Sequence, residues 1–208
     1  MSFGEEDLGT TGPLAPGHVS KVAVLASGEG TNLQALIDSL GEDPIVEIVA
    51  FVASREDAPA LTRAQAAGIS TKVFDKADFA NRPTRDLALA AWLIGQGVGL
   101  VVLAGWMELL TATLLDAFPD RVVNVHPSLL PEFPGMDAVG QAVAAGAERI
   151  GVTVHLVDEG VDTGRVLMQE GIDLPAGATA EEAAELLRPI EHRLLPEAVR
   201  ALANGRLA

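Results

Sequence analysis

Short apolar runs alternate with amphipathic stretches along the first part of the chain. The runs are rich in β-branched residues and predict buried strands at 21–26, 45–53, 71–74, 100–104 and 121–125. Between them, apolar residues recur at helical spacing, which predicts helices over 33–40, 58–67, 85–96 and 111–118. Strands that alternate with helices indicate parallel strands joined by crossover helices. The pattern therefore predicts a doubly wound, mostly parallel α/β sheet.

This alternation stops after residue 126. Three prolines within 127–134 predict an extended loop. Two further apolar runs, at 151–157 and 166–172, are joined by the segment 158–164. Because that segment is too short to hold a crossover helix, these two strands are predicted to be antiparallel.

Two helices complete the predicted elements. Helical spacing predicts one over 139–145. Thr179 and Glu182 match the pattern of a capping box, so we expect a C-terminal helix to begin there. Pro189 falls inside that helix and is expected to interrupt or kink it.

Length and composition indicate one domain. The chain has 208 residues, of which 49% are hydrophobic, enough for a sizeable core. Glycine, proline, serine and threonine dominate residues 1–20, so we expect a mobile tail there and a single domain over 21–208. No apolar run is long enough to span a membrane, and the first residues lack the features of a signal peptide. We therefore expect a cytoplasmic protein without membrane contacts.

The charge and the missing cysteines exclude several classes of function. Fourteen basic residues stand against 29 acidic ones, a formal charge of −15, which argues against a nucleic-acid partner. A small anion held by backbone amides remains possible. The absence of cysteine excludes disulfides and thiol catalysis. The four histidines show no ligand spacing, so no metal site is expected.

The turn Ser27-Gly-Glu-Gly-Thr-Asn32 lies between the first strand and the first helix. Its glycines allow a close backbone approach, and free N–H groups at a helix start attract phosphate. The turn matches only part of a nucleotide-binding fingerprint, so a turn that simply requires glycine is an equal alternative. Glu29 would repel a phosphate unless its side chain points away.

Asn124 and His126 lie at the carboxyl end of the last parallel strand, where open α/β sheets bind ligands. Two residues apart on a strand, they should face the same side. Histidine suits acid–base catalysis, and asparagine can donate to an oxyanion. The alternative is a structural histidine in a proline-rich loop.

Three acidic residues, Asp158, Glu159 and Asp162, occupy the loop before Gly164. A carboxylate near His126 would stabilise the imidazolium. The alternative is a solvated acidic turn. Taken by pattern alone, Trp106 and Met107 are expected in the core, and Glu191 is expected to be a surface acid.

Together these segments resemble the phosphoribosylglycinamide formyltransferases, which are folate-dependent enzymes. The motifs occur in the order of that family: Ser-Gly-x-Gly-Thr-Asn-Leu-Gln at 27–34, Leu-Ala-Gly at 103–105, Asn-Val-His-Pro-Ser-Leu-Leu-Pro at 124–131, Phe-Pro-Gly at 133–135, and Val-His-Leu-Val with Asp-Thr-Gly within 154–164. The resemblance runs from residue 21 to about residue 207. It implies a Rossmann-like formyltransferase fold with an antiparallel C-terminal strand pair and a C-terminal helix.

The resemblance also implies a reaction in purine biosynthesis. The amine of glycinamide ribonucleotide would attack the formyl group of the co-substrate 10-formyltetrahydrofolate, through a tetrahedral intermediate. By analogy Asn124 would hold the oxyanion and His126 would assist it in charged form. Asp162 would pair with His126 and organise a water that accepts the amine proton. Ser128 would fix the loop by hydrogen bonds.

Substrate contacts carry over by position. The residues that match ribonucleotide contacts are Gly30, Thr31, Asn32 and Glu191. The residues that match the folate side are Arg82, Met107, Glu108, Leu109, Leu110, Asp158 and Val161. Both substrates are small molecules, and the oligomeric state is not indicated by the sequence.

Four positions depart from the usual pattern of the family. Glu108 replaces a usual arginine, Trp106 a phenylalanine, Asp137 a histidine, and Glu29 often an asparagine. Glu29 and Asp137 add negative charge near the expected ribonucleotide or catalytic region. Together with Glu108 they keep one alternative open, a formyltransferase or 10-formyltetrahydrofolate hydrolase with a different acceptor. A binding module without catalysis is a further alternative, and the presence of Asn124, His126 and Asp162 argues against it.

Overall fold

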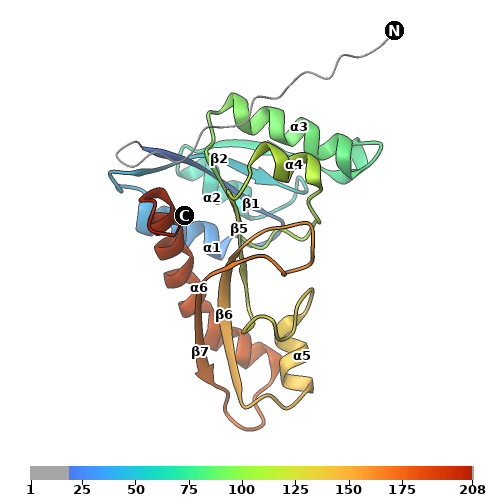
Figure 1. Cartoon of the computed structure of the whole chain (residues 1–208), viewed down its shortest axis with the longest axis vertical. Coiled ribbons are helices and arrows are strands. Elements are labelled where there is room, and N and C mark those ends of the chain that lie inside the picture. The colour runs from blue at the N-terminus through green and yellow to red at the C-terminus, as the bar shows by residue number, and fades with distance from the viewer. Residues whose placement is uncertain (1–18, 208) are drawn as a thin grey trace.

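Seven strands form one sheet in residues 19–207, the part of the chain that the computed structural model describes. The sheet order is β3-β2-β1-β4-β5-β6-β7 (Figure 1). The parallel strands are β1 (Ser20–Ala26), β2 (Val46–Ala53), β3 (Ser70–Val73), β4 (Leu100–Leu103) and β5 (Val122–His126). The strands β6 (Arg149–Leu156) and β7 (Val166–Asp173) complete the sheet in antiparallel pairing.

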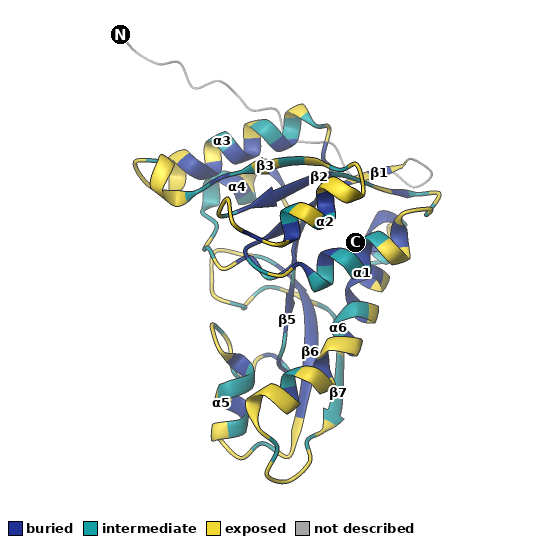
Figure 2. Ribbon diagram, turned by 180° about the vertical axis from the view of Figure 1, so that it is seen from behind, coloured by how far each residue is buried: buried dark blue, intermediate teal, exposed yellow. Residues whose placement is uncertain are grey.

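Helices cover both faces of this sheet. They are α1 (Thr31–Leu40), α2 (Ala60–Ala66), α3 (Arg82–Gly95), α4 (Ala112–Ala117), α5 (Ala138–Ala144) and α6 (Ala180–Ala203), with a 3-10 turn η1 (Lys76–Asp78). Alternate residues of β1 enter two separate cores: Val22 and Val24 pack with α1, α2 and α6, whereas Ala23 and Leu25 pack with α3 and α4. In Figure 2 the sheet is mostly buried and the helices are exposed on their outer faces. The predicted doubly wound sheet is confirmed.

Two predictions about helices need correction. Helix α6 is continuous through Pro189, so the interruption, one of the two outcomes expected there, is wrong. Proline removes one hydrogen bond, and the long apolar face of α6, buried between α1 and β6, holds the helix together across it. Helix α3 begins at Arg82 instead of residue 85, because Asn81 and Thr84 cap its first turn reciprocally.

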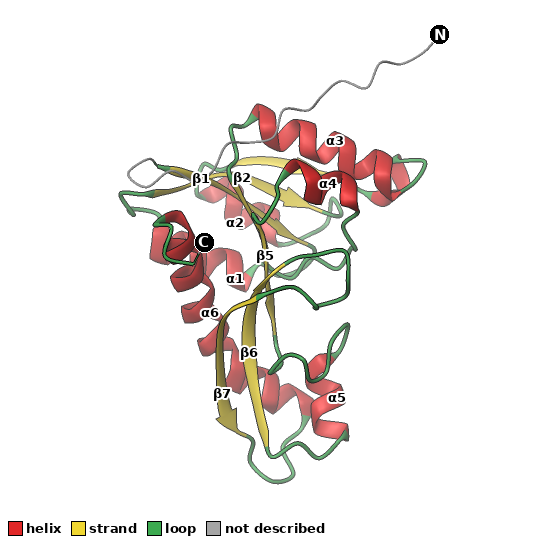
Figure 3. Cartoon of the chain, in the orientation of Figure 1, coloured by secondary structure: helices red, strands yellow, loops and turns green. Residues whose placement is uncertain are grey.

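The fold brings several loops to one edge. In the sheet, β2 and β3 lie on one side of β1, whereas β4 and β5 lie on its other side. The order therefore reverses between β1 and β4, and ligands of open sheets bind beyond the carboxyl ends of strands at such a point. Figure 3 shows loops after β5 and between β6 and β7 on the same side of the long strands. Residues 1–18 of the predicted tail lie outside the described residues, and Ser20 begins β1. No helix within 19–207 has the length and apolarity that crossing a membrane requires.

Candidate active site

Three adjoining cavities lie at the carboxyl ends of β1, β4 and β5. The turn cavity, about 510 Å³, is lined by residues 27–32 and the start of the loop after β4. The central cavity, about 680 Å³, is lined by Asn124, His126 and Asp162. The outer cavity, about 430 Å³, lies between the segments 106–112 and 157–162. Among the described residues, Glu108 alone lines all three.

The turn after β1 needs glycine at position 30 for two reasons. Gly30 has a φ of 72°, in the left-handed region. A Cβ atom there would lie 2.6 Å from the Cβ of Ala60 in α2. The carbonyl of Gly28 accepts a hydrogen bond of 3.2 Å from the N–H of Ala60, which keeps turn and helix close together. The first N–H groups of α1 therefore lie at the turn cavity, where they suit an anion.

Asn32 joins this turn to the C-terminal helix. Its Nδ2 donates to Oε2 of Glu191 over 3.0 Å, across 159 positions in sequence. Burial raises the pKa of Glu191 above its usual value, although the hydrogen bond from Asn32 and the nearby charge of Arg188 oppose this. The interpretation of Glu191 as a surface acid from pattern alone is therefore wrong. Two predicted ribonucleotide contacts are neighbours in space.

Asn124 and His126 both line the central cavity, as the alternation along β5 predicts. Nδ1 of His126 lies 3.4 Å from Oδ2 of Asp162. Its Nε2 donates to the carbonyl oxygen of Phe133 at 3.0 Å. One ring nitrogen thus contacts a backbone carbonyl, and the other lies at ion-pair distance from a carboxylate. The side chain of His126 is 7% exposed, and the part that remains open faces the central cavity.

Asp162 is held from four sides. The N–H of Gly135 donates to it over 2.7 Å, and Nδ2 of Asn124 over 3.4 Å. Burial would raise its pKa, but hydrogen bonds from His155 and Gly135 and the charge of His126 outweigh burial, so the pKa of Asp162 is lowered. With its side chain 13% exposed, Asp162 is not part of a solvated acidic turn. Asp158 does fit that description, because its carboxylate accepts from Gly160 and Thr163 in the same loop.

His155 belongs to the same cluster, although it was not among the predicted site residues. The antiparallel register places it directly opposite Asn124. Its Nδ1 donates to the carbonyl of Leu156 at 2.8 Å, and its Nε2 lies 3.2 Å from Nδ2 of Asn124 and 3.4 Å from Oδ1 of Asp162. The position of His155 beside Asn124 depends on the pairing register between β5 and β6, which cannot be read from the sequence.

The predicted folate-side residues gather around the outer cavity with one exception. Its lining includes Arg82, Glu108, Leu109, Leu110, Asp158 and Val161. Met107 instead lines the turn and central cavities, and its 65% exposure contradicts the expectation of a core residue. Leu109 and Val161 are also exposed, so these walls offer apolar surface to a ligand. Trp106 is 8% exposed and packs in the core as expected.

The family model for formyl transferases matches residues 20–199. The chain belongs to the formyl transferase family. A phosphoribosylglycinamide formyltransferase of Bacillus subtilis is 38% identical over 88% of this chain and 95% of its own length. A glycinamide ribonucleotide transformylase from Symbiobacterium toebii, solved by crystallography, is 42% identical over 92% of this chain and 91% of its own, with a TM-score of 0.90.

A trifunctional purine biosynthetic protein of Drosophila pseudoobscura pseudoobscura is 39% identical over 90% of this chain. The match covers only 14% of that longer protein. The similarity therefore concerns one part of a larger chain in that case, and nearly the whole protein in the two bacterial relatives.

Among the acids that depart from the family pattern in this formyltransferase, Glu108 has charged partners. Glu108 lies 3.2 Å from Nζ of Lys76 and 3.4 Å from Nη1 of Arg85, so two cations offset its charge. The carboxylate of Asp137 lies against Gly140, where a Cβ atom would collide with it. Ser128 donates to the carbonyl of Glu132 at 2.6 Å, in keeping with its predicted role in fixing the loop. Residues 19–207 hold no cluster of three potential metal ligands.

Proposed function

We propose that this protein transfers the formyl group of 10-formyltetrahydrofolate to the amine of glycinamide ribonucleotide. The observation that carries the proposal is the meeting of Asn124, His126 and Asp162 in the central cavity. That cavity shares residues with the turn cavity on one side and with the outer cavity on the other. An anionic substrate and an extended apolar one would then meet at these three side chains.

The turn cavity would receive the ribonucleotide. Backbone N–H groups at the start of α1 suit the phosphate, with Gly30, Thr31 and Asn32 as its surroundings. Glu191 would contact the remainder of that substrate, since it lines the central cavity beside Asn32. Arg188, one turn before Glu191 on α6, was not predicted from sequence, and its positive charge acts on Glu191.

The outer cavity would receive the folate. Arg82 at the start of α3 would face the acidic tail of that substrate, and the segment 107–110 with Asp158 and Val161 would form the walls. The apolar side chains would cover the ring system, while backbone groups supply hydrogen bonds. No metal or covalent adduct with the enzyme is needed for such a transfer.

In the central cavity the formyl group would pass directly from the folate to the amine. The amine nitrogen forms a bond to the formyl carbon, and the carbonyl electron pair moves onto oxygen. Asn124 and the His126 imidazolium would stabilise that oxyanion. The amine loses a proton to a water held by Asp162, N10 of the folate gains one, and the bond between the formyl carbon and N10 breaks. The products are formylated ribonucleotide and tetrahydrofolate.

A spectroscopic assay with the purified protein tests this proposal. Consumption of 10-formyltetrahydrofolate is followed with and without glycinamide ribonucleotide. Acceptor-dependent consumption supports the proposal. Formate release without acceptor would indicate a hydrolase, and folate binding without either reaction would indicate a binding module. Cell fractionation tests the accompanying proposal of a cytoplasmic location.

A further inference from the structure

A buried ion pair lies directly behind the wall between the cavities. Arg85 and Asp86 in the first turns of α3 are 1% and 0% exposed. Nε and Nη2 of Arg85 donate to Oδ1 of Asp86 at 3.0 and 2.8 Å. Neither residue is among the lining residues of the three cavities. The pair therefore has no direct route to a substrate.

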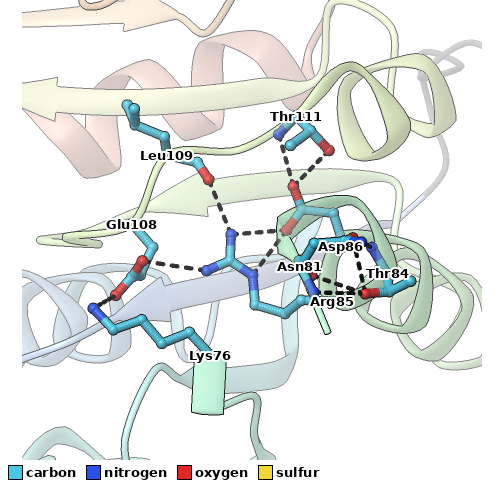
Figure 4. A network of polar contacts seen from close by, with 8 residues as sticks. All are labelled: Lys76, Asn81, Thr84, Arg85, Asp86, Glu108, Leu109 and Thr111. Atoms are coloured by element: carbon cyan, nitrogen blue, oxygen red, sulfur yellow. Dashed lines mark hydrogen bonds and ion pairs between the residues drawn. The ribbon is translucent and has the colours of Figure 1, made fainter. Parts of the chain in front are cut away.

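Both members of the pair reach the segment 105–111 that follows β4 (Figure 4). Nη2 of Arg85 donates to the carbonyl of Leu109 at 2.9 Å. Oδ2 of Asp86 accepts from the N–H of Thr111 at 2.7 Å and from its hydroxyl at 2.8 Å. Three hydrogen bonds to charged groups thus hold two points of one short segment.

The same arginine also orients Glu108. Its Nη1 lies 3.4 Å from Oε2 of Glu108, while Lys76 approaches Oε1. The network is neutral, because it contains the cations Lys76 and Arg85 and the anions Asp86 and Glu108 (Figure 4). The charge of the Glu108 carboxylate, which lines all three cavities, is therefore balanced within the network. The ring of Trp106 lies 5.8 Å from the guanidinium carbon, which completes the packing around Arg85.

We propose that Arg85 and Asp86 are positioning residues that hold the segment 105–111 in the shape required for folate binding. Desolvating an ion pair is expensive, and apolar residues often stabilise a core equally well, so stability alone is a poor reason for this pair. Its hydrogen bonds define where the carbonyl of Leu109 and the start of α4 lie, and both border the outer cavity. This inference rests on the proposed function, because it takes the outer cavity as the folate side.

The test compares Asp86→Asn with Asp116→Asn, which removes an exposed carboxylate from α4. An asparagine cannot accept from Arg85 and from both donors of Thr111 as a carboxylate does. We expect the KM for 10-formyltetrahydrofolate to rise roughly 10- to 100-fold, the scale of lost hydrogen bonds to a charged group. The KM for glycinamide ribonucleotide and kcat should change by less than about threefold, and Asp116→Asn should match the wild type in both.

A milder pair of variants keeps the test decisive if Asp86→Asn does not fold. Thr111→Val removes only the hydroxyl contact, and Thr111→Ser restores a hydroxyl. We expect Thr111→Val to raise the folate KM and Thr111→Ser to return it toward the wild-type value. A purely structural role would lower the melting temperature in Thr111→Val without moving the folate KM, and that result would overturn the inference.

Binding measured directly separates this inference from the proposed function. Tryptophan fluorescence reports tetrahydrofolate binding, because Trp106 borders the outer cavity. A wild-type protein that binds no tetrahydrofolate and transfers no formyl group would overturn both ideas. Wild-type binding and transfer with an unchanged folate affinity in folded Asp86→Asn would overturn the positioning role alone.

Discussion

Replacing Asp162 with asparagine removes the charge of one carboxylate and, at Oδ1, the acceptor for Nδ2 of Asn124. In the wild type, the N–H of Gly135 donates to Oδ2 of Asp162 over 2.7 Å. The amide oxygen of asparagine can still accept this hydrogen bond, so the loop keeps an acceptor in place. The substitution removes the negative charge that lies 3.4 Å from Nδ1 of His126. We therefore expect a folded protein that lacks the negative charge beside His126.

The distance sets the magnitude. Two unit charges 3.4 Å apart interact by about 1 kcal/mol in a water-like medium and about 5 kcal/mol at an effective dielectric of 20. Because the two side chains are only 7% and 13% exposed, the effect should exceed the water-like limit. A loss of about 2.7 kcal/mol corresponds to a fall of roughly 100-fold in kcat.

The assay is steady-state turnover of 10-formyltetrahydrofolate with saturating glycinamide ribonucleotide. Asp116→Asn is the control, because it removes one negative charge at an exposed position outside the three cavities. The control should retain kcat within about threefold, since exposed charges interact weakly. Circular dichroism checks that both variants are folded. A decrease smaller than about tenfold for Asp162→Asn (1.4 kcal/mol) would refute the assigned partnership with His126.

Three further predictions concern stability and the turn. Gly30→Ala should destabilise the protein by at least about 1–2 kcal/mol and raise the KM for glycinamide ribonucleotide, because its Cβ meets Ala60 at 2.6 Å; Gly28→Ala, with open space around it, should keep the melting temperature. Since the pKa of Glu191 is raised in the folded state, its stabilising contribution is present below about pH 4.5 and lost as the pH rises through the folded pKa. Thermal melts should therefore show Glu191→Gln to be more stable than the wild type at pH 7, and this difference in stability should shrink toward pH 4.5. The same difference between variant and wild type at both pH values would contradict the burial argument. The lowered pKa of Asp162 has the opposite sign: its contribution is present above about pH 4 and lost as the pH falls through the folded pKa, so Asp162→Asn should lose less stability on acidification than the wild type.

Local pattern was enough for much of this molecule. The strand and helix alternation follows from periodicities of two and 3.6 residues, and those periodicities are local properties. The shared orientation of Asn124 and His126 is of the same kind, because alternate residues of one strand face one side. The motif order within 27–164 was also sufficient to identify the resemblance to formyltransferases.

Contacts between distant segments were decided only by the tertiary structure. The register of β5 against β6 brought His155 opposite Asn124, and the packing of α6 brought Glu191 to Asn32. Pro189 shows the same limit in a different form, since the packing of a buried helix face outweighs the local preference to end a helix.

The balance of charge was also determined partly by the sequence and partly by the fold. The sequence by itself determined that acids outnumber bases and that Glu108 replaces a usual arginine. Only the folded chain places Lys76 and Arg85 around that glutamate and buries Asp86 beneath the cavity wall. The reason is physical: electrostatic interactions depend on separation and burial in space, and neither quantity is written in the order of residues along the chain.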